Sequence, residues 1–503
     1  MSHPFFGKEF SFTQPDGSRL AVRGWGDQHR AVFETLDGYT VTRNPATGFY
    51  EYAAVVRNET ELHPTGVRPD SVEPEALGIP RGARISRAAA VAEVEARAAL
   101  PKPRWETRRE QKRLGARVRA LAAPGIAPAP PARTTVGDFV GLCLLVEFPD
   151  VSATISRQDV ESFCNQEGYN GFGNRGSVRD YFLEVSTGKL NYTTVVAPWY
   201  TAQNPRAYYT NPDVEYGLRT RELIQEALQW RLAQGLDLSA LTADDGGFVY
   251  ATNVFYAGEV VNQWSEGLWP HASRLIHPFS LGGGIFASDY QITGMESELT
   301  LGTYCHENGH MLCDFPDLYD YGSPGIRSGG VGAFCLMCAG SNVEEKNPVH
   351  VGAYLKYEAG WADAAVPLQP GNFTARAGTN EFFILEKNST EYFLLENRHQ
   401  SGRDASLPDA GLAIWHVDVL GSNSREQMTL ASHYECSLEQ ADGEFDMERG
   451  QQFGDDRDLF HAGWKDAFSG TTVPSSNWWD GTASGLTIKD IGPAGPAITL
   501  SVE

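Results

Sequence analysis

The pattern of apolar and polar residues changes several times along the chain, and each change predicts a different kind of element. Short strand-like runs occur at 19–23, 31–35 and 39–42, separated by Asp-Gly and Asn-Pro turn signals. Residues 86–122 are rich in Ala, Arg and Glu and predict a helical stretch broken by Pro101 and Pro103. The Pro- and Ala-rich residues 123–133 that follow predict an extended, exposed linker.

A second unit begins near residue 136. Residues 139–148 form a nearly continuous apolar run of strand length, which predicts a central strand buried on both faces. Helical spacing follows at 177–184 and 217–232, and residues 248–256 predict another strand. Strands dominate again from about residue 367, at 381–385, 392–396, 412–417 and 486–502.

These patterns predict an α+β, multi-domain protein. Residues 1–85 are a β-rich region, and residues 86–135 are a basic helical segment followed by the linker. Residues 136–365 are a unit with a mixed sheet and helices, and residues 366–503 are a C-terminal β-rich module. The basic residues of 104–119 predict either a solvated helix face or a surface that docks onto the acidic remainder of the chain.

Charge and composition exclude some partners. The formal net charge of −23 argues against nucleic acid, because phosphates repel such a surface. No run of about 18 apolar residues is present, so we expect no transmembrane segment. The N-terminal residues lack the pattern of a secretory signal, which favours a cytoplasmic protein or export by an unrecognised route. Seven cysteines do not describe a disulfide framework.

The segment His306-Glu-Asn-Gly-His310 carries the strongest chemical signal. On a helix, residues four apart lie on one face, so both imidazoles can bind one Zn²⁺. Glu307 lies beside them and is suited to accept a proton from a water molecule that the metal acidifies. Asp314-Phe-Pro316 is expected to end the helix. The alternative is a structural helix whose histidines are satisfied by hydrogen bonds.

The surrounding sequence resembles the immune inhibitor A family of bacterial metallopeptidases. The matching segments are 306–320 (His-Glu-Asn-Gly-His … Pro-Asp-Leu-Tyr-Asp), 334–340, 24–27, 34–40, 177–184, 395–398 and 411–418. The resemblance spans nearly the whole chain. It implies a zincin-like catalytic domain at 136–365, an N-terminal propeptide-like region, secretion, and synthesis as a zymogen.

The third metal ligand departs from the usual pattern of this class. Cys313 stands where a Gly is expected, and Pro316, which has no ligating side chain, stands at the ligand position. The match to the Pro-Asp-Leu-Tyr-Asp segment implies Asp317 as the third ligand. The alternatives are Asp314, Asp320 and Glu344.

Several other residues are candidates for supporting roles. The resemblance implies that Met337 lies beneath the metal as the methionine of a methionine turn. Tyr319 or Tyr321 is suited to stabilise an oxyanion, and His271 and His416 are either structural or placed at the cleft wall.

Two further clusters have alternative interpretations. Cys335 and Cys338 form a Cys-x-x-Cys motif, and buried packing is favoured over redox or metal chemistry. Five aspartates form an acidic, Gly-containing segment that suits either a solvated loop or a Ca²⁺ site: Asp442, Asp446, Asp455, Asp456 and Asp458.

The sequence therefore predicts a zinc-dependent endopeptidase acting on polypeptides, with Glu307 as the general base and His306, His310 and Asp317 as metal ligands. One alternative is a non-proteolytic zinc amidase on the same helix. Another is a binding or adhesion protein whose β-rich module recognises its target while the peptidase unit is degenerate. The intact His/Glu/His set argues against degeneracy.

Overall fold

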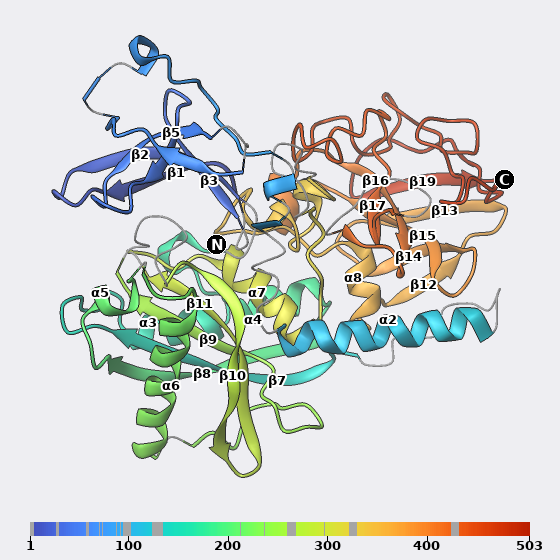
Figure 1. Ribbon diagram of the computed structural model, residues 1–503. Coiled ribbons are helices and arrows are strands. Elements are labelled where there is room, and N and C mark those ends of the chain that lie inside the picture. The colour runs from blue at the N-terminus through green and yellow to red at the C-terminus, as the bar shows by residue number, and fades with distance from the viewer. Residues whose placement is uncertain are drawn as a thin grey trace.

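The structure, a computed structural model, has an α+β fold with several separate sheets (Figure 1). It describes residues 5–26, 30–56, 60–69, 71–72, 74–86, 88–90, 92–93, 102–122, 134–211, 213–235, 237–258, 268–295, 297–320, 329–423 and 432–503. No helix in these ranges is both long enough and apolar enough to cross a membrane.

The N-terminal region is a six-stranded antiparallel sheet in which each strand pairs with the next along the chain. Its strands are β1 (Phe5–Thr13), β2 (Arg19–Gly26), β3 (Ala31–Thr35), β4 (Thr40–Arg43), β5 (Tyr50–Val55) and β6 (Leu62–Pro64), followed by the short helix η1 (Pro74–Leu77). An aromatic cluster that includes Phe5 and Phe33 packs against Trp269 of the second unit. The predicted strands at 19–23, 31–35 and 39–42 correspond to β2, β3 and β4.

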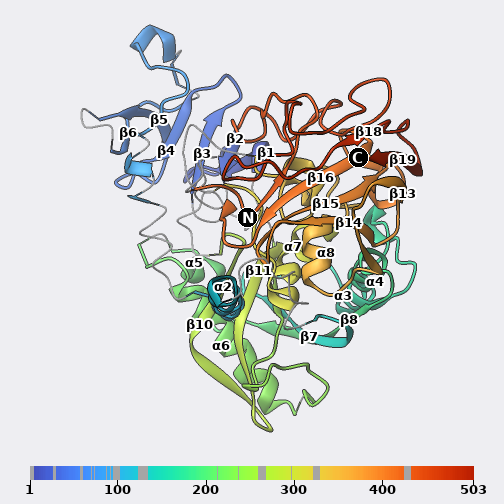
Figure 2. The ribbon, with the colours of Figure 1, turned by 90° about the vertical axis from the view of Figure 1, so that its right-hand side faces the viewer.

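Helix α2 (Arg104–Ala122) begins directly after Pro103, as the proline pattern predicts. In Figure 1 it lies along one side of the molecule, from near α7 (Leu301–Cys313) past α8 (Ala353–Glu358). Figure 2 views this helix end-on. The linker predicted at 123–133 lies outside the described residues.

The central sheet has the strand order β10-β11-β9-β7-β8. Its strands are β7 (Gly137–Glu147), β8 (Leu190–Thr201), β9 (Thr252–Ala257), β10 (His271–Gly282) and β11 (Ile285–Met295). Four of them run parallel, and β10 is an antiparallel strand at one edge. Strand β7 lies in the interior of the sheet, as its continuous apolar run predicts.

Alternate residues of β7 enter two different cores, because side chains on a strand point alternately to opposite faces. Cys143 and Leu145 pack with α3 (Arg157–Asn165), α4 (Val178–Val185) and α7 (Leu301–Cys313). Leu142 and Leu144 pack with the second group of helices, α5 (Arg206–Tyr209) and α6 (Leu218–Ala233). The sheet is therefore covered on both faces, and α7 lies against one of them.

The C-terminal part contains two sheets. The larger has the order β12 (Ala364–Pro367), β14 (Glu381–Glu386), β15 (Glu391–Arg398), β16 (Gly411–Asp418), β17 (Cys436–Leu438). The smaller has the order β13 (Gly371–Arg376), β19 (Ala497–Val502), β18 (Ile488–Lys489). The remaining short helices are η2 (Gly171–Gly173), η3 (Gly332–Phe334), η4 (Ala339–Ser341), α8 (Ala353–Glu358) and η5 (Gly402–Ser406).

One hydrophobic core crosses the expected boundary between residues 365 and 366. Leu394 and Trp415 of the larger C-terminal sheet belong to the same cluster as Tyr304 and Met311 of α7. The opposite face of that sheet packs against β19 in a separate core. The C-terminal module therefore supports the unit that carries α7 and does not fold around a wholly independent core.

Candidate metal centre

Helix α7 carries the His-Glu-x-x-His segment and is buried along nearly its whole length. A polar network anchors it to the sheet through Asn308, one of the variable positions of the motif. Tyr192 donates its hydroxyl hydrogen to Asn308 Oδ1 over 2.8 Å, and Asn308 Nδ2 donates to Asn253 Oδ1 over 2.9 Å. Gln291 donates to the same Asn253 oxygen over 3.0 Å. Three strands thus fix the helix with fully buried hydrogen bonds.

Backbone carbonyls orient both histidines. His306 Nδ1 lies 2.9 Å from the carbonyl oxygen of Leu336, and His310 Nδ1 lies 2.6 Å from that of Phe315. A carbonyl oxygen only accepts hydrogen bonds, so each Nδ1 carries a proton and each Nε2 is the ring nitrogen left for a metal ion. This arrangement, in which the second ring nitrogen is held by the protein, is typical of histidines that bind a metal through Nε2.

After α7 has ended, the chain turns back and places Asp317 next to the Nε2 atoms of His306 and His310. Asp314 takes a left-handed conformation (φ 57°, ψ 30°) and turns the chain back beneath α7. Asp317 Oδ1 then lies 3.0 Å from His306 Nε2 and 3.4 Å from His310 Nε2. The two Nε2 atoms are 3.2 Å apart. Of the alternative third ligands, Asp314 lies 2.7 Å from Arg108 of the N-terminal segment, and Glu344 is exposed.

Glu307 is the third residue of the candidate metal group. Ligand atoms of His306, Glu307 and His310 all lie within 4.8 Å of one another. Glu307 Oε1 is 3.9 Å from His306 Nε2, which is longer than a metal ligand pair requires but close enough to reach a water molecule at the same site. Both carboxylate oxygens are buried and accept no hydrogen bond from the described residues. Burying a carboxylate without hydrogen-bond partners is unfavourable in free energy. Both Glu307 oxygens therefore remain available to bind another group.

The electrostatics fit a cation-binding site. Burial by itself lowers the pKa of His310, but Asp317 outweighs burial and raises that pKa to about 9. Burial opposes ionisation of Asp317, yet His310 and His306 hold the pKa of its carboxyl far below its usual value. Asp317 is therefore an anion at neutral pH. A proton on His310 Nε2 supplies the positive charge next to this carboxylate, at the atom through which the imidazole would bind a metal ion.

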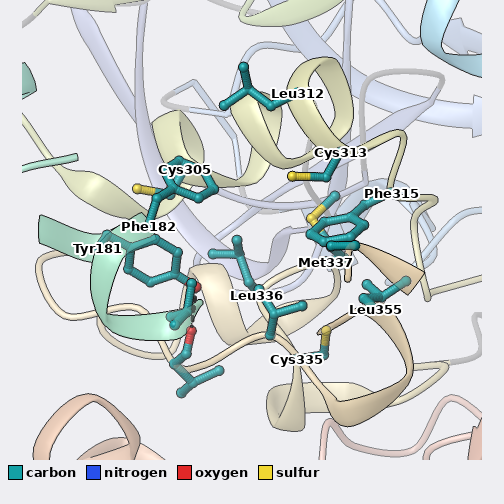
Figure 3. Packing of buried hydrophobic residues seen from close by; sticks show 14 of the residues in the cluster. Tyr181, Phe182, Cys305, Leu312, Cys313, Phe315, Cys335, Leu336, Met337 and Leu355 are labelled. Atoms are coloured by element: carbon teal, nitrogen blue, oxygen red, sulfur yellow. Dashed lines mark hydrogen bonds between the residues drawn. The ribbon is translucent and has the colours of Figure 1, made fainter. Parts of the chain in front are cut away.

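The predicted methionine lies beneath the helix. Figure 3 shows Met337 next to Phe315 on the side of α7 that faces the core. Its sulfur lies 2.8 Å from the position that a Cβ on Gly309 would occupy, so glycine is required there for the close approach. Met337 also accepts a backbone hydrogen bond from Leu318 over 2.8 Å, which joins its turn to the Asp317 segment.

The remaining candidates lie elsewhere. Tyr319 is buried in the core around α7. His416 is buried on β16, between Glu391 and Glu439 at 3.3 Å from each, and it stacks on Trp479. Glu344 is exposed, and Tyr321 lies outside the described residues.

The other histidine and the thiols have structural partners. His271 lies between the carbonyl oxygen of Trp269 and the hydroxyl of Tyr290, and burial lowers its pKa to about 4. All seven cysteines are buried and none is joined to another in a disulfide, which agrees with the packing interpretation of Cys335 and Cys338.

Helix α2 lies against the candidate site through a contact with His310 that the sequence did not reveal. The indole of Trp105 stacks on the imidazole of His310, with ring centroids 4.5 Å apart and planes inclined by 17°. The first turn of α2 is capped by Asp289, whose oxygens accept hydrogen bonds from the backbone nitrogens of Arg104 (2.9 Å) and Trp105 (3.1 Å). The sequence signal for this contact was Trp105 itself, an aromatic residue just after Pro103 at the start of the basic segment.

The basic residues of α2 dock onto the rest of the chain. Arg104 pairs with Asp244 at 2.9 Å, Arg108 with Asp314 at 2.7 Å, and Lys112 with Glu358 at 3.0 Å. Arg109 pairs with the buried Glu435, and Arg113 donates to the carbonyl oxygens of Val419 and Leu420. Of the two sequence interpretations, these contacts support docking onto the acidic remainder. Asp314, one of the alternative third ligands, is thus paired with α2.

The fold and the site define an α+β protein with a buried residue group able to bind a metal ion. No family model and no curated protein matches the sequence. Among solved structures, one similar chain is catalytically inactive OgpA from Akkermansia muciniphila in complex with an O-glycopeptide substrate. It is 13% identical, with a TM-score of 0.21, over 54% of this chain and 73% of that chain. A likeness at this level supports no argument about function.

Proposed function

We propose that this protein is a zinc-dependent endopeptidase of the immune inhibitor A type. The observation that carries the proposal is the triangle of His306 Nε2, His310 Nε2 and Asp317 Oδ1, with edges of 3.0, 3.2 and 3.4 Å. Ligands about 2.0–2.1 Å from a tetrahedral zinc ion are separated by about 3.3 Å. The three residues therefore have the donor types and the spacing that zinc requires.

When bound, zinc would supply Lewis acidity at a carbonyl oxygen and a lowered pKa for a water molecule. The chain's own contribution is the Glu307 carboxylate, which accepts a proton from the attacking water. It then delivers that proton to the leaving amide nitrogen, as a positioned general base and acid. The lack of a hydrogen-bond partner for either Glu307 oxygen among the described residues supports this role, because a partnered carboxylate is a weaker base.

The protein is latent while α2 is in place. Trp105 covers the ring of His310, and substrate cannot occupy the space that the indole fills. The charged contacts of Arg104, Arg108, Arg109 and Lys112 hold the helix across the site. The pair of Arg109 with Glu435 should respond least to salt, because the two side chains are 13% and 4% exposed and buried pairs are screened far less than surface pairs. Residues 1–122 therefore act as a covering region that must be released.

One experiment tests the function against its alternatives. The purified full chain is assayed for zinc content and for hydrolysis of casein and of a small amide, before and after limited trypsin treatment. We expect about one zinc per chain, and caseinolysis that rises after trypsin and stops on addition of a chelator. Hydrolysis of the small amide without caseinolysis identifies an amidase, and zinc-free, inactive protein identifies a binding protein. Either of those results overturns the proposal.

A further inference from the structure

The first turn of α2 places an arginine side chain between a carboxylate and an aromatic ring of the second unit. Arg104 Nη2 donates to Asp244 Oδ2 over 2.9 Å, and the guanidinium carbon lies 3.4 Å from the centroid of the Phe248 ring. A carboxylate that pairs with the charge and a ring face that stacks on the flat group together favour arginine over other cations. We call Asp244 and Phe248 the arginine site.

Contacts in which α2 takes no part hold the arginine site in place. Asp244 Oδ1 accepts hydrogen bonds from the backbone nitrogens of Gly246 (2.9 Å) and Phe248 (3.0 Å), and Oδ2 is the oxygen that meets the guanidinium. Phe248 forms a parallel bridge to Phe286 of β11, and their rings lie 5.7 Å apart. Burial raises the pKa of Asp244, but Arg104 and the two backbone hydrogen bonds outweigh burial and lower that pKa. We therefore expect the site to keep its shape and its negative charge when α2 is released.

A second arginine of α2 lies beside the first. Arg108 is 2.7 Å from Asp314 and 3.7 Å from Asp244, so one guanidinium lies between two carboxylates. Its guanidinium carbon is 5.3 Å from the centroid of the Tyr250 ring. Asp289 accepts hydrogen bonds from the first two backbone nitrogens of the same helix. Release of α2 withdraws these partners together, and the carboxylates that they leave behind favour a substrate that brings positive charge.

The arginine site lies next to the candidate metal centre. Arg104 and Trp105 are consecutive, so their Cα atoms are about 3.8 Å apart. The indole of Trp105 stacks on the imidazole of His310. Each residue of an extended peptide spans about 3.3–3.6 Å. A substrate side chain that enters the arginine site therefore belongs to a residue about one or two positions from the bond held at the metal.

We propose that, once α2 has been released, the arginine site binds an arginine side chain of the substrate close to the bond that is cleaved. The inference rests on the proposed peptidase function and names its substrate class, polypeptides with arginine about one or two residues from the scissile bond. In the latent protein, Arg104 occupies the place that a substrate arginine takes in the active one. Lysine should be accepted less well, because its ammonium group can pair with Asp244 but has no flat face to stack on Phe248.

Matched peptides test the arginine site without any change to the protein. A quenched fluorescent peptide with one arginine is compared with the same peptide carrying lysine or citrulline, a neutral side chain of nearly the same shape as arginine. The variable residue is moved along the peptide on both sides of the cleaved bond. The full chain is activated with trypsin, trypsin is removed on an immobilised inhibitor, and only the chelator-sensitive rate is counted. We expect kcat/KM at the best position to be at least about tenfold higher for arginine than for citrulline, with lysine between them.

Variants of the arginine site then assign the preference to its two residues. Asp244→Asn should reduce the ratio of kcat/KM for the arginine peptide to that for the citrulline peptide to about one, because the charge that pairs with the guanidinium is lost. Asp245→Asn, at an exposed neighbouring position, is the matched control and should preserve the wild-type ratio. Phe248→Leu should narrow the difference between the arginine and lysine peptides. Each ratio compares two substrates of one protein, so a loss of folded protein cancels.

The outcomes separate this inference from the peptidase function on which it rests. Chelator-sensitive cleavage of the arginine and citrulline peptides at equal rates overturns the arginine site and leaves the peptidase proposal standing. An arginine preference that Asp244→Asn retains in full also overturns the site, because another group then binds the guanidinium. No chelator-sensitive cleavage of casein or of any of the peptides overturns both proposals.

Discussion

Trp105 stacks face to face on His310, so a residue of the N-terminal segment lies directly against a candidate metal ligand more than 200 positions later in the chain. The stack buries the outer face of the imidazole, and the capping of α2 by Asp289 fixes the position of the indole. The contact between Trp105 and His310 links the proposed metal site to the proposed latency of the uncleaved protein. Under the proposed function, this contact both shields the site from water and excludes substrate.

Replacing Trp105 should partly activate the uncleaved protein. We expect Trp105→Ala to raise caseinolysis several-fold without trypsin, because the ring that covers His310 is removed while the charged contacts of α2 remain. Leu114→Ala on the same helix is the matched control, since Leu114 is 62% exposed, and it should not change activity. Equal activity of both variants and wild type would show that α2 does not block the site.

Cleavage after α2 should release the covering region. We expect limited trypsin to cut between about Arg119 and Thr135 and peptidase activity to rise in parallel, because release converts an intramolecular contact into one that dilution disrupts. Higher salt should assist release by screening the more exposed pairs over a Debye length of about 8 Å. N-terminal sequencing and activity are followed together. Cleavage at this position with unchanged activity identifies residues 1–122 as an ordinary structural domain.

The general base is tested by Glu307→Gln. This variant should retain zinc, because the carboxylate is 3.9 Å from His306 Nε2 and is not needed as a ligand. Its kcat/KM for peptides should fall by about 10²–10⁴ after activation, the usual contribution of a positioned base. His310→Ala is the comparison and should lose the zinc itself. Activity of Glu307→Gln within tenfold of wild type removes Glu307 from the proposed mechanism.

The third ligand is tested by comparing two aspartates of one loop. Asp317→Ala should lower zinc affinity far more than Asp314→Ala, because only Asp317 lies 3.0–3.4 Å from the two Nε2 atoms. Asp314 is paired with Arg108, so its loss should instead loosen α2. Competition with a zinc chelator measures both affinities. A larger loss of zinc in Asp314→Ala would reassign the ligand.

A buried ion pair behind the site predicts a pH limit on stability. Arg398 binds both oxygens of Asp404 (2.8 and 2.9 Å) and donates to the carbonyl of Phe334 over 2.6 Å. Burial alone would raise the pKa of Asp404, but Arg398 holds that pKa well below its usual range. A group with a lowered folded-state pKa stabilises above its unfolded pKa of about 3.9 and loses that effect as the pH falls.

Asp404→Asn should therefore lower the free energy of unfolding by about 3–5 kcal/mol at pH 7, since it leaves the Arg398 charge buried without its main partner. The difference from wild type should shrink below about pH 4, where Asp404 takes up a proton in the unfolded state while it stays ionised beside Arg398 in the folded protein. Urea unfolding at several pH values measures both effects. Asp480→Asn, which removes an exposed partner of Lys387, is the control and should leave the midpoint nearly unchanged. A pH-independent effect of Asp404→Asn contradicts the assignment.

Much of the local structure was predictable because it depends on neighbours in sequence. Proline positions and apolar spacing predicted the start of α2, the interior strand β7 and the helices α4 and α6 to within a few residues. Strands β8, β10 and β11 were missed, because their alternating or mixed patterns resemble loops until a sheet buries them. The resemblance to a known family, rather than spacing, pointed to Asp317 and Met337.

The sequence by itself determined the chemistry: two histidines one helical turn apart, a glutamate between them, and helix and strand patterns set by residues a few positions away. Only the tertiary structure decided which distant groups meet that chemistry. Asn253 fixes Asn308, Leu336 orients His306, and Trp105 covers His310. Such contacts join residues 30 to 205 positions apart. They arise from the packing of α2 and α7 against the sheets, and no local pattern encodes that packing.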